Sequence, residues 1–330
     1  MGRYRLRSDL DRAVINGFAL PLGIAPGDLE APMSGYTIAY ASGVDDEPDT
    51  YSFYVVVSHE RITTVLHRVF DLLPKQVYGL VEITSRDAYR PIDVFIGREQ
   101  ISLSRFLETW QRCELVLLEE GSIGAGAYSE EPFVEIFLDQ WKALSIIVPL
   151  AMKEPVELML QGIDLQEVPE TWKVLGDARA LEAAEIRPVL DPADGSPDLD
   201  DLLWQLRNDW RLDLDVDPDN NVDESGRPLG MTLWHAVVSV REPQEGSPKE
   251  ADASIWATAG SLSDAEILID TALSQWQFAE IYAIDRVAYD ERPEELVDLT
   301  LKRDRAEVHL VQIETRARQQ TDEGRELSDG

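Results

Sequence analysis

The sequence has few of the residues that form disulfides and zinc sites, with one cysteine and four histidines among 330 residues. The single Cys113 excludes an intrachain disulfide, and it excludes a zinc site that needs several thiolates. Cys113 lies near the end of an expected amphipathic helix, so we predict a buried and unreactive thiol. A lone cysteine is also typical of a reducing compartment, which favours a cytoplasmic protein.

Long apolar runs are absent as well. The longest, such as residues 54–57 and 144–149, fall short of the roughly 20 residues that a membrane-spanning helix needs. The chain starts with basic residues, but the weak apolar stretch that follows is interrupted by Asn16, Gly17 and Pro21, unlike a signal peptide. We therefore predict a soluble protein without a membrane partner.

Basic residues are scarce, and lysine above all. The chain has 30 Lys and Arg residues, only six of them Lys, against 63 Asp and Glu residues, which gives a net charge of −33. Such a surface repels phosphates, so direct nucleic-acid binding is not expected. The acidity has two explanations, which the sequence leaves open: adaptation to a saline cytoplasm, and a surface that selects a basic protein partner.

The first half of the chain contains the clearest secondary-structure patterns. Two strands of a hairpin are expected at 36–42 and 50–57, followed by a helix that begins after Ser58 and ends at Pro74. Further strands are expected at 76–83, 92–97, 114–120, 132–139 and 144–149, with helices around 103–110 and 152–163. These patterns predict an α+β domain with a largely antiparallel sheet.

In the second half, strands are expected at 209–216, 232–240 and 252–259. Ser263 and Glu266 have the spacing of a capping box, which predicts a long helix that continues to Tyr289. Residues 296–314 fit both a heptad and an alternating strand, and we favour a helix because the preceding Pro-Glu-Glu-Leu is a typical helix start. The heptads are too few to predict an oligomeric state.

The fold class predicted from these elements is α+β, with two α+β units, largely antiparallel sheets and a C-terminal helical segment. The expected divisions are an N-terminal segment (1–29), an α+β domain (30–175), a helix with an acidic linker (176–201), a second, Trp-rich α+β domain (202–302), and a C-terminal helix with a disordered tail (303–330).

The most conspicuous chemical pattern is a row of carboxylates. Asp213, Asp215 and Asp217 alternate with apolar residues and would share one face of a strand, and Asp223 and Glu224 follow. Such a row can bind Mg²⁺, Mn²⁺ or Ca²⁺ and support hydrolysis of phosphate esters. It is not an EF-hand, because a proline stands where that loop requires glycine. We favour a solvated strand face.

Three further residues are candidates for ligand or partner contact. The glycine-rich stretch 121–131 is expected to be a flexible loop with Tyr128 at its tip. A strand follows this stretch, which argues against a dinucleotide-binding loop. Trp234 and His235 lie side by side in a strand of the Trp-rich half, where structural packing is the alternative role.

No motif for a catalytic nucleophile or a phosphate-binding loop is present, so an enzymatic activity is not expected. The leading hypothesis is a non-enzymatic binding or protein-interaction module with a basic protein partner and no cofactor. The alternative is a metal-dependent hydrolase that uses the aspartate row and a divalent cation. A third hypothesis is a nucleic-acid mimic, in which carboxylates replace phosphates.

Overall fold

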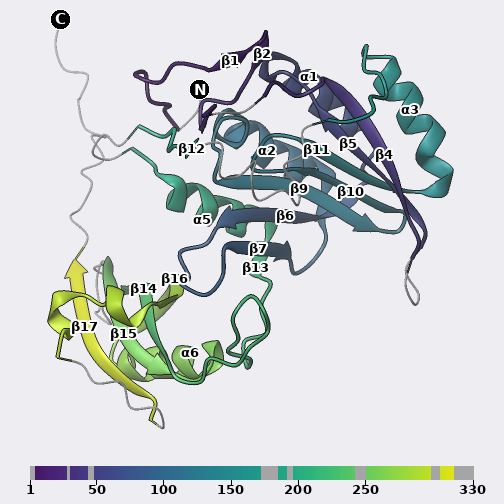
Figure 1. Ribbon diagram of the computed structural model, residues 1–330. Helices are drawn as coiled ribbons and strands as arrows, with labels where there is room; N and C mark the ends of the chain where they lie inside the picture. Colours follow the sequence, from purple (N-terminus) through teal and green to yellow (C-terminus); the bar gives the residue numbers. More distant parts are fainter. Residues whose placement is uncertain are drawn as a thin grey trace, which may run out of the picture. The chain divides into compact units, whose positions relative to one another are not determined.

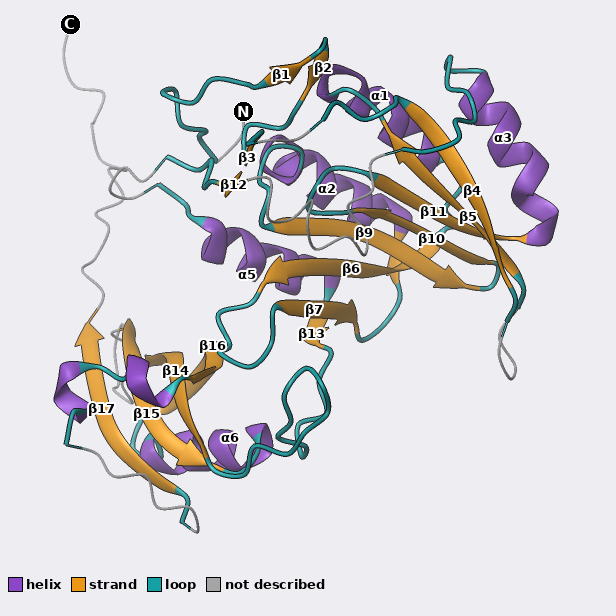
Figure 2. Cartoon of the chain, viewed as in Figure 1, coloured by secondary structure: helices purple, strands orange, loops and turns teal. Residues whose placement is uncertain are grey.

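The computed structural model describes residues 4–27, 30–43, 48–171, 185–191, 196–241, 250–298 and 305–315. The chain forms two compact units. Unit 1 contains Met1–Thr84 and Ile92–Asp215, and unit 2 contains Ser85–Pro91 and Val216–Gly330. Each unit combines helices with an antiparallel sheet (Figures 1 and 2), which confirms the predicted α+β class.

Unit 1 is organised around a nine-stranded sheet with the order β13-β7-β6-β9-β10-β11-β5-β4, in which β8 also pairs with β6. Its strands are β4 (Gly35–Ala41), β5 (Thr50–Val56), β6 (Gln76–Thr84), β7 (Ile92–Gly97), β8 (Ile101–Ser102), β9 (Ile123–Glu130), β10 (Phe133–Leu138), β11 (Leu144–Pro149) and β13 (Leu212–Leu214). Short pairs of strands accompany it: β1 (Val14–Ile15) with β2 (Phe18–Ala19), and β3 (Ile24–Ala25) with β12 (Glu185–Ile186). The predicted hairpin of β4 and β5 is confirmed.

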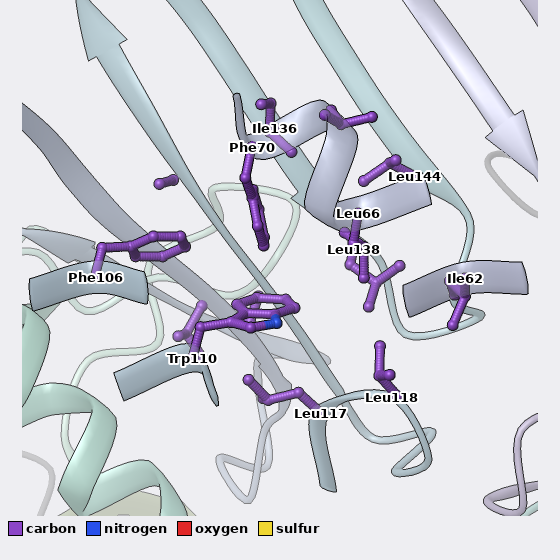
Figure 3. Close-up of a cluster of buried hydrophobic side chains, with 14 of the residues drawn as sticks. Ile62, Leu66, Phe70, Phe106, Trp110, Leu117, Leu118, Ile136, Leu138 and Leu144 are labelled. Carbon is purple, nitrogen blue, oxygen red and sulfur yellow. The ribbon is translucent and has the colours of Figure 1, made fainter. Parts of the chain in front are cut away.

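One face of this sheet is covered by α1 (His59–Phe70), α2 (Leu103–Leu117) and α5 (Leu199–Trp210), whose apolar sides join the main core. A 3₁₀ turn (Leu150–Met152) leads into α3 (Lys153–Gln161). Figure 3 shows side chains of α1 and α2 directed toward those of β10 and β11. Burying one such large apolar side chain contributes about 1.5–3 kcal/mol.

The helix starts follow from local sequence. The Ser102 side chain caps α2 by accepting a hydrogen bond from the Arg105 N–H, and Asp198 and Asp201 form a reciprocal capping box at α5. Cys113 of α2 is fully buried, as predicted, and burial raises its pKa to about 12. A thiol with that pKa is a poor nucleophile at neutral pH.

Two predictions for residues 114–131 are wrong. Residues 114–117 continue α2, because Val116 and Leu117 extend the buried side of the helix. The glycine-rich stretch is strand β9 and not a loop. Glycine is needed there because a Cβ on Gly126 would collide with the carbonyl oxygen of Ile136 on the neighbouring strand, and one on Gly124 would meet the Phe137 ring.

Unit 2 contains a four-stranded antiparallel sheet with the order β16-β14-β15-β17. Its elements are β14 (Thr232–Arg241), β15 (Glu250–Ala259), α6 (Leu262–Ala272), β16 (Gln277–Val287), two 3₁₀ turns (Tyr289–Glu291 and Glu294–Leu296) and β17 (Glu307–Thr315). Ile269 and Leu273 from α6 and its C-cap pack against Val238, Ala253 and Ile255 of the sheet. Figure 2 shows α6 against this sheet.

Two helix predictions for unit 2 are wrong. The helix α6 ends at Ala272, its N-cap is Ser261 instead of Ser263, and the expected continuation is strand β16. Within the predicted C-terminal helix, residues 307–315 form strand β17, because this segment pairs antiparallel with β15 along its length, from Thr315 opposite Ala251 to Glu307 opposite Thr258. The predicted tail at 316–330 lies outside the described residues.

A buried arginine organises the end of unit 2. The guanidinium of Arg286, 4% exposed, donates to the Asp87 carboxylate at 2.8 Å, to Asn221 Oδ1 at 2.9 Å and to the Val222 carbonyl at 2.7 Å. The Arg286 N–H also donates to Asp87, at 3.0 Å. Buried charges are stable only when they are paired and hydrogen-bonded in this way.

The units divide the chain elsewhere than the expected boundary at residue 202. Helix α5 packs on α2, and β13 pairs with β7, so both belong to unit 1. Most of the expected helix in 176–201 lies outside the described residues.

Candidate functional site

The aspartate row begins at the edge of the unit 1 sheet. Asp213 lies on β13, and its carboxylate accepts a hydrogen bond from the Arg98 guanidinium. The Asp215 N–H donates to the Val94 carbonyl at 2.8 Å, which ties the next turn of chain to β7. The division between the units follows Asp215, so Asp217, Asp223 and Glu224 belong to unit 2.

The carboxylates of Asp217 and Asp223 in unit 2 accept hydrogen bonds within their own turns. The Asp217 carboxylate accepts from the Asp219 N–H at 3.0 Å. Hydrogen bonds from Ser225 and from the Arg227 N–H lower the pKa of Asp223, whose carboxylate also pairs with the Arg227 guanidinium at 3.0 Å. Within the described part of the chain, no three His, Cys, Asp or Glu side chains are grouped so as to hold a metal ion.

Trp234 and His235 point to opposite faces of β14, as neighbours on a strand must. Trp234 is 5% exposed, packs beside Ala259 and Ala265, and donates from Nε1 to the Ala259 carbonyl at 3.3 Å. His235 lies on the face opposite α6, where its ring stacks on Trp256 with centroids 4.3 Å apart. Burial lowers the pKa of His235. The aromatic neighbour of His235 is therefore Trp256, which sequence reasoning missed.

Tyr128 lies on β9, on the face of the unit 1 sheet opposite α1 and α2. Strand register places Tyr78 of β6 and Glu135 of β10 on either side of it. The Tyr78 and Tyr128 rings are stacked, with centroids 5.1 Å apart and planes at 19°. Both rings are half-buried, so this pair is accessible from that face.

Two carboxylates share this face with the tyrosines. Glu82 of β6 and Glu135 of β10 are both half-buried. Burial raises the pKa of Glu82. Burial, together with the nearby charge of Glu82, raises the pKa of Glu135. Among the residues that the structure describes, neither carboxylate has a cation as an ion-pair partner, so each negative charge lies in a poorly solvated place without a cation to compensate it.

Gly126 occupies the centre of this arrangement. It pairs with Leu80 on one side and with Phe137 on the other, and it has no side chain of its own. We call the set formed by Tyr78, Glu82, Tyr128 and Glu135 around Gly126 the glutamate–tyrosine surface. Sequence reasoning identified only Tyr128, because the two glutamates are 53 positions apart and meet only through strand pairing.

A separate group of charged side chains holds the N-terminal segment in place. Burial alone would raise the pKa of Glu119, but hydrogen bonds from His59, Arg12 and the Leu22 N–H lower it to about 2. The distances are 3.1 Å to His59 Nε2 and 2.5 Å to Arg12 Nη2. This carboxylate therefore anchors residues 12–22 to the end of α2.

A buried lysine lies near this anchor. Burial lowers the pKa of Lys142 to about 8, and its ammonium donates to the Ile123 carbonyl at 2.6 Å. Burial raises the pKa of Asp139 in the same turn to about 6. The adjoining cavity, lined by His59, Lys142 and residues 18–21, offers about 10 Å³ to the centres of water molecules, which is room for about one water. It is too small for a metabolite.

No protein-family model matches the chain, and no curated protein or solved structure matches it. Among the described residues, no helix has the length and apolar character needed to cross a membrane.

Proposed function

We propose that this protein is a non-enzymatic interaction module of the cytoplasm that binds a basic segment of a partner protein through the glutamate–tyrosine surface. One observation carries the proposal: Glu82 and Glu135 are half-buried on one face of the sheet, and no cation among the described residues neutralises them. The net charge of −33 adds long-range attraction for a basic partner.

The physical argument concerns solvation. Moving a carboxylate out of water is unfavourable unless a cation or hydrogen-bond donors replace the water. The two glutamates meet this penalty in the free protein and also repel each other. A cation from a partner would remove both penalties on binding, while the half-buried Leu80 and the tyrosine rings offer apolar contact to the rest of its side chain.

The experiment measures binding of fluorescein-labelled hexa-arginine by anisotropy at physiological salt. The double variant Glu82→Gln/Glu135→Gln should bind at least tenfold more weakly, because its surface has lost both charges. The matched control, Glu108→Gln/Glu154→Gln, removes two exposed charges from α2 and α3 and should bind within about twofold of the wild type. Equal weakening in both variants would mean that only net charge attracts the peptide, and the proposal would fail.

The proposal assigns no catalytic role to the aspartate row. The Asp213 carboxylate forms an ion pair with Arg98. The Asp223 carboxylate accepts a hydrogen bond from the Arg227 N–H and pairs with the Arg227 guanidinium, so neither carboxylate can bind a metal cation without breaking these bonds. A titration of Mg²⁺, Mn²⁺ and Ca²⁺ by calorimetry, with Asp215→Asn as the control, tests the hydrolase alternative. A nucleic-acid mimic is supported by the overall charge alone.

A further inference from the structure

The outer edge of β4 is a sheet edge without a charged residue. The two large sheets end in four described strands, which are β13 and β4 in unit 1 and β16 and β17 in unit 2. β13 has only three residues and includes an aspartate, while β16 and β17 each contain two carboxylates. β4 (Figure 1) is seven residues long and has neither a charge nor a proline. Charge, proline and short length protect sheet edges from pairing with another strand, so β4 is the edge that is open to such pairing.

The backbone groups that this edge presents follow from its existing bonds. The Tyr36 N–H donates to the Gln166 carbonyl at 3.0 Å, and the Tyr36 carbonyl accepts from the Val168 N–H at 2.9 Å. Tyr36 therefore directs both groups away from β5, and in an antiparallel ladder the next alternate residues, Ile38 and Tyr40, do the same. No described residue pairs with Ile38 or Tyr40 on that side. The chain has thus added a short parallel segment at the start of this edge, and the rest of the edge is unpaired among the described residues.

The unpaired part of the edge is uncharged along its length and acidic at both ends. The Tyr40 ring, 55% exposed, lies between exposed alanines and packs edge-on against Tyr51 with centroids 5.7 Å apart. At one end the Tyr40 hydroxyl donates to the Asp49 carboxylate at 2.8 Å, and at the other end Glu167 is exposed beside the start of β4. Neither carboxylate has an ion-pair partner within the described part of the chain. The ammonium of Lys153, 5.3 Å from the centre of the Tyr51 ring, is already paired on its own helix.

We propose that the edge formed by residues 38–41 of β4 binds an extended segment of a partner protein as an added strand, and that this segment has an uncharged centre and a basic residue at each end. Ile38 and Tyr40 supply two N–H donors and two carbonyl acceptors to the added strand. The basic ends complement Glu167 and Asp49. The site is separate from the glutamate–tyrosine surface, because β11 and β5 lie between β4 and the strands that form that surface.

Charge disfavours a second copy of the chain as the occupant. Each copy has a net charge of −33, so two copies repel each other. In addition, two β4 strands paired about a twofold axis would run antiparallel, which brings the end of one beside the start of the other. Asp49 of one copy would then approach Glu167 of the other, so like charges would meet at both ends of the paired strands.

The test measures anisotropy of the fluorescein-labelled peptide Lys-Thr-Val-Thr-Val-Lys with the full chain at physiological salt. A second peptide has the same sequence with N-methyl groups on the residues between the lysines, which removes backbone donors and keeps the charge. We expect it to bind at least tenfold more weakly, and equal affinity would overturn the proposal. A third peptide with glutamine in place of both lysines should bind at least fivefold more weakly, and equal affinity would overturn the assignment of basic ends.

Variants of the protein identify the edge. Tyr40→Pro removes the outward N–H and leaves the ladder to β5 intact, because proline is accommodated on an edge strand where its nitrogen faces solvent. It should weaken the first peptide at least tenfold, whereas the matched control Tyr40→Ala, which keeps the N–H and loses the ring, should bind within about threefold of the wild type. Equal weakening in both would assign recognition to the ring and overturn strand addition. Circular dichroism checks the fold of each variant, and the N-methylated peptide tests the proposal without any change to the protein.

Two further measurements separate this site from the alternatives. Glu82→Gln/Glu135→Gln should bind the first peptide within about twofold of the wild type, and a tenfold loss would place the peptide on the glutamate–tyrosine surface instead. Sedimentation velocity should show a monomer. A dimer that Tyr40→Pro dissociates and Tyr40→Ala does not would make a second copy the occupant and overturn the proposal.

Discussion

The two faces of the nine-stranded sheet in unit 1 are made by the same strands but differ in chemistry. On the helix-covered face, Val81, Ala127, Val134 and Ile136 are fully buried. On the opposite face, the alternate residues of the same strands include half-buried tyrosines and glutamates beside the buried Gly126 and Phe137. The covered face contributes most of the buried apolar core, whereas the opposite face carries ionisable groups whose charged forms burial disfavours.

The largest expected contrast between the faces is in stability. Trp110→Ala on α2 should lower the free energy of unfolding by about 3–5 kcal/mol, because it leaves a cavity where Trp110 packs against Phe70 at 4.9 Å between ring centroids. Tyr128→Leu on the opposite face should lower it by about 1 kcal/mol or less. Equilibrium unfolding in guanidinium chloride measures both, and similar losses would remove the distinction between the faces.

A smaller effect has the opposite sign. Glu135→Gln should raise the free energy of unfolding by about 0.5 kcal/mol, because it removes a half-buried charge that burial and Glu82 disfavour. The same variant should bind hexa-arginine more weakly, so stability and binding change in opposite directions. Urea unfolding measures the first property and anisotropy the second. A loss of stability would indicate instead that the Glu135 charge supports the fold.

The smallest expected effect concerns pH. Glu82 and Glu135 have pKa values that are raised in the folded protein, so the folded chain holds their protons more tightly and these two groups favour folding as the pH falls. The stability advantage of Glu82→Gln/Glu135→Gln over the wild type should therefore be greatest at pH 7 and shrink toward the ordinary carboxyl range near about 4.3. Taking the difference between two proteins cancels the titration of the other carboxylates. A gap that widens on acidification would contradict the assignment.

Local pattern predicted the elements whose own residues specify them. The hairpin of β4 and β5 and the helix after Ser58 show clear strand and helix periodicity, and both are present. The secondary-structure predictions were wrong where pairing with neighbouring strands determines the conformation of a segment. Strand β9 has glycines and alanines that do not favour a strand by themselves, but it is paired along its length by β6 and β10. Strands β16 and β17 contain apolar residues that also fit helical spacing, and pairing to β14 and β15 selects the strand.

Most of the candidate site could not be predicted from the sequence for the same reason. The aspartate row is visible in the sequence because its members are neighbours, and Tyr128 stands out beside glycines. Glu82 and Glu135 are two among 63 acidic residues, and only the register of three strands brings them to one place. The same holds for Trp256 beside His235, which depends on the pairing of β14 with β15.

The ion pair between Arg286 and Asp87 has a consequence for dissecting the molecule. Asp87 belongs to unit 2, although the segment that contains it, Ser85–Pro91, interrupts the sequence of unit 1 between β6 and β7. A fragment that ends at Asp215 would keep the aspartate and lose its arginine, and a fragment that starts at Val216 would do the reverse, leaving a buried charge unmatched in either half. A cut after Asp215 should therefore destabilise the fragment that holds the unmatched charge, and expression of the two halves as separate chains should give less stable proteins than the intact chain.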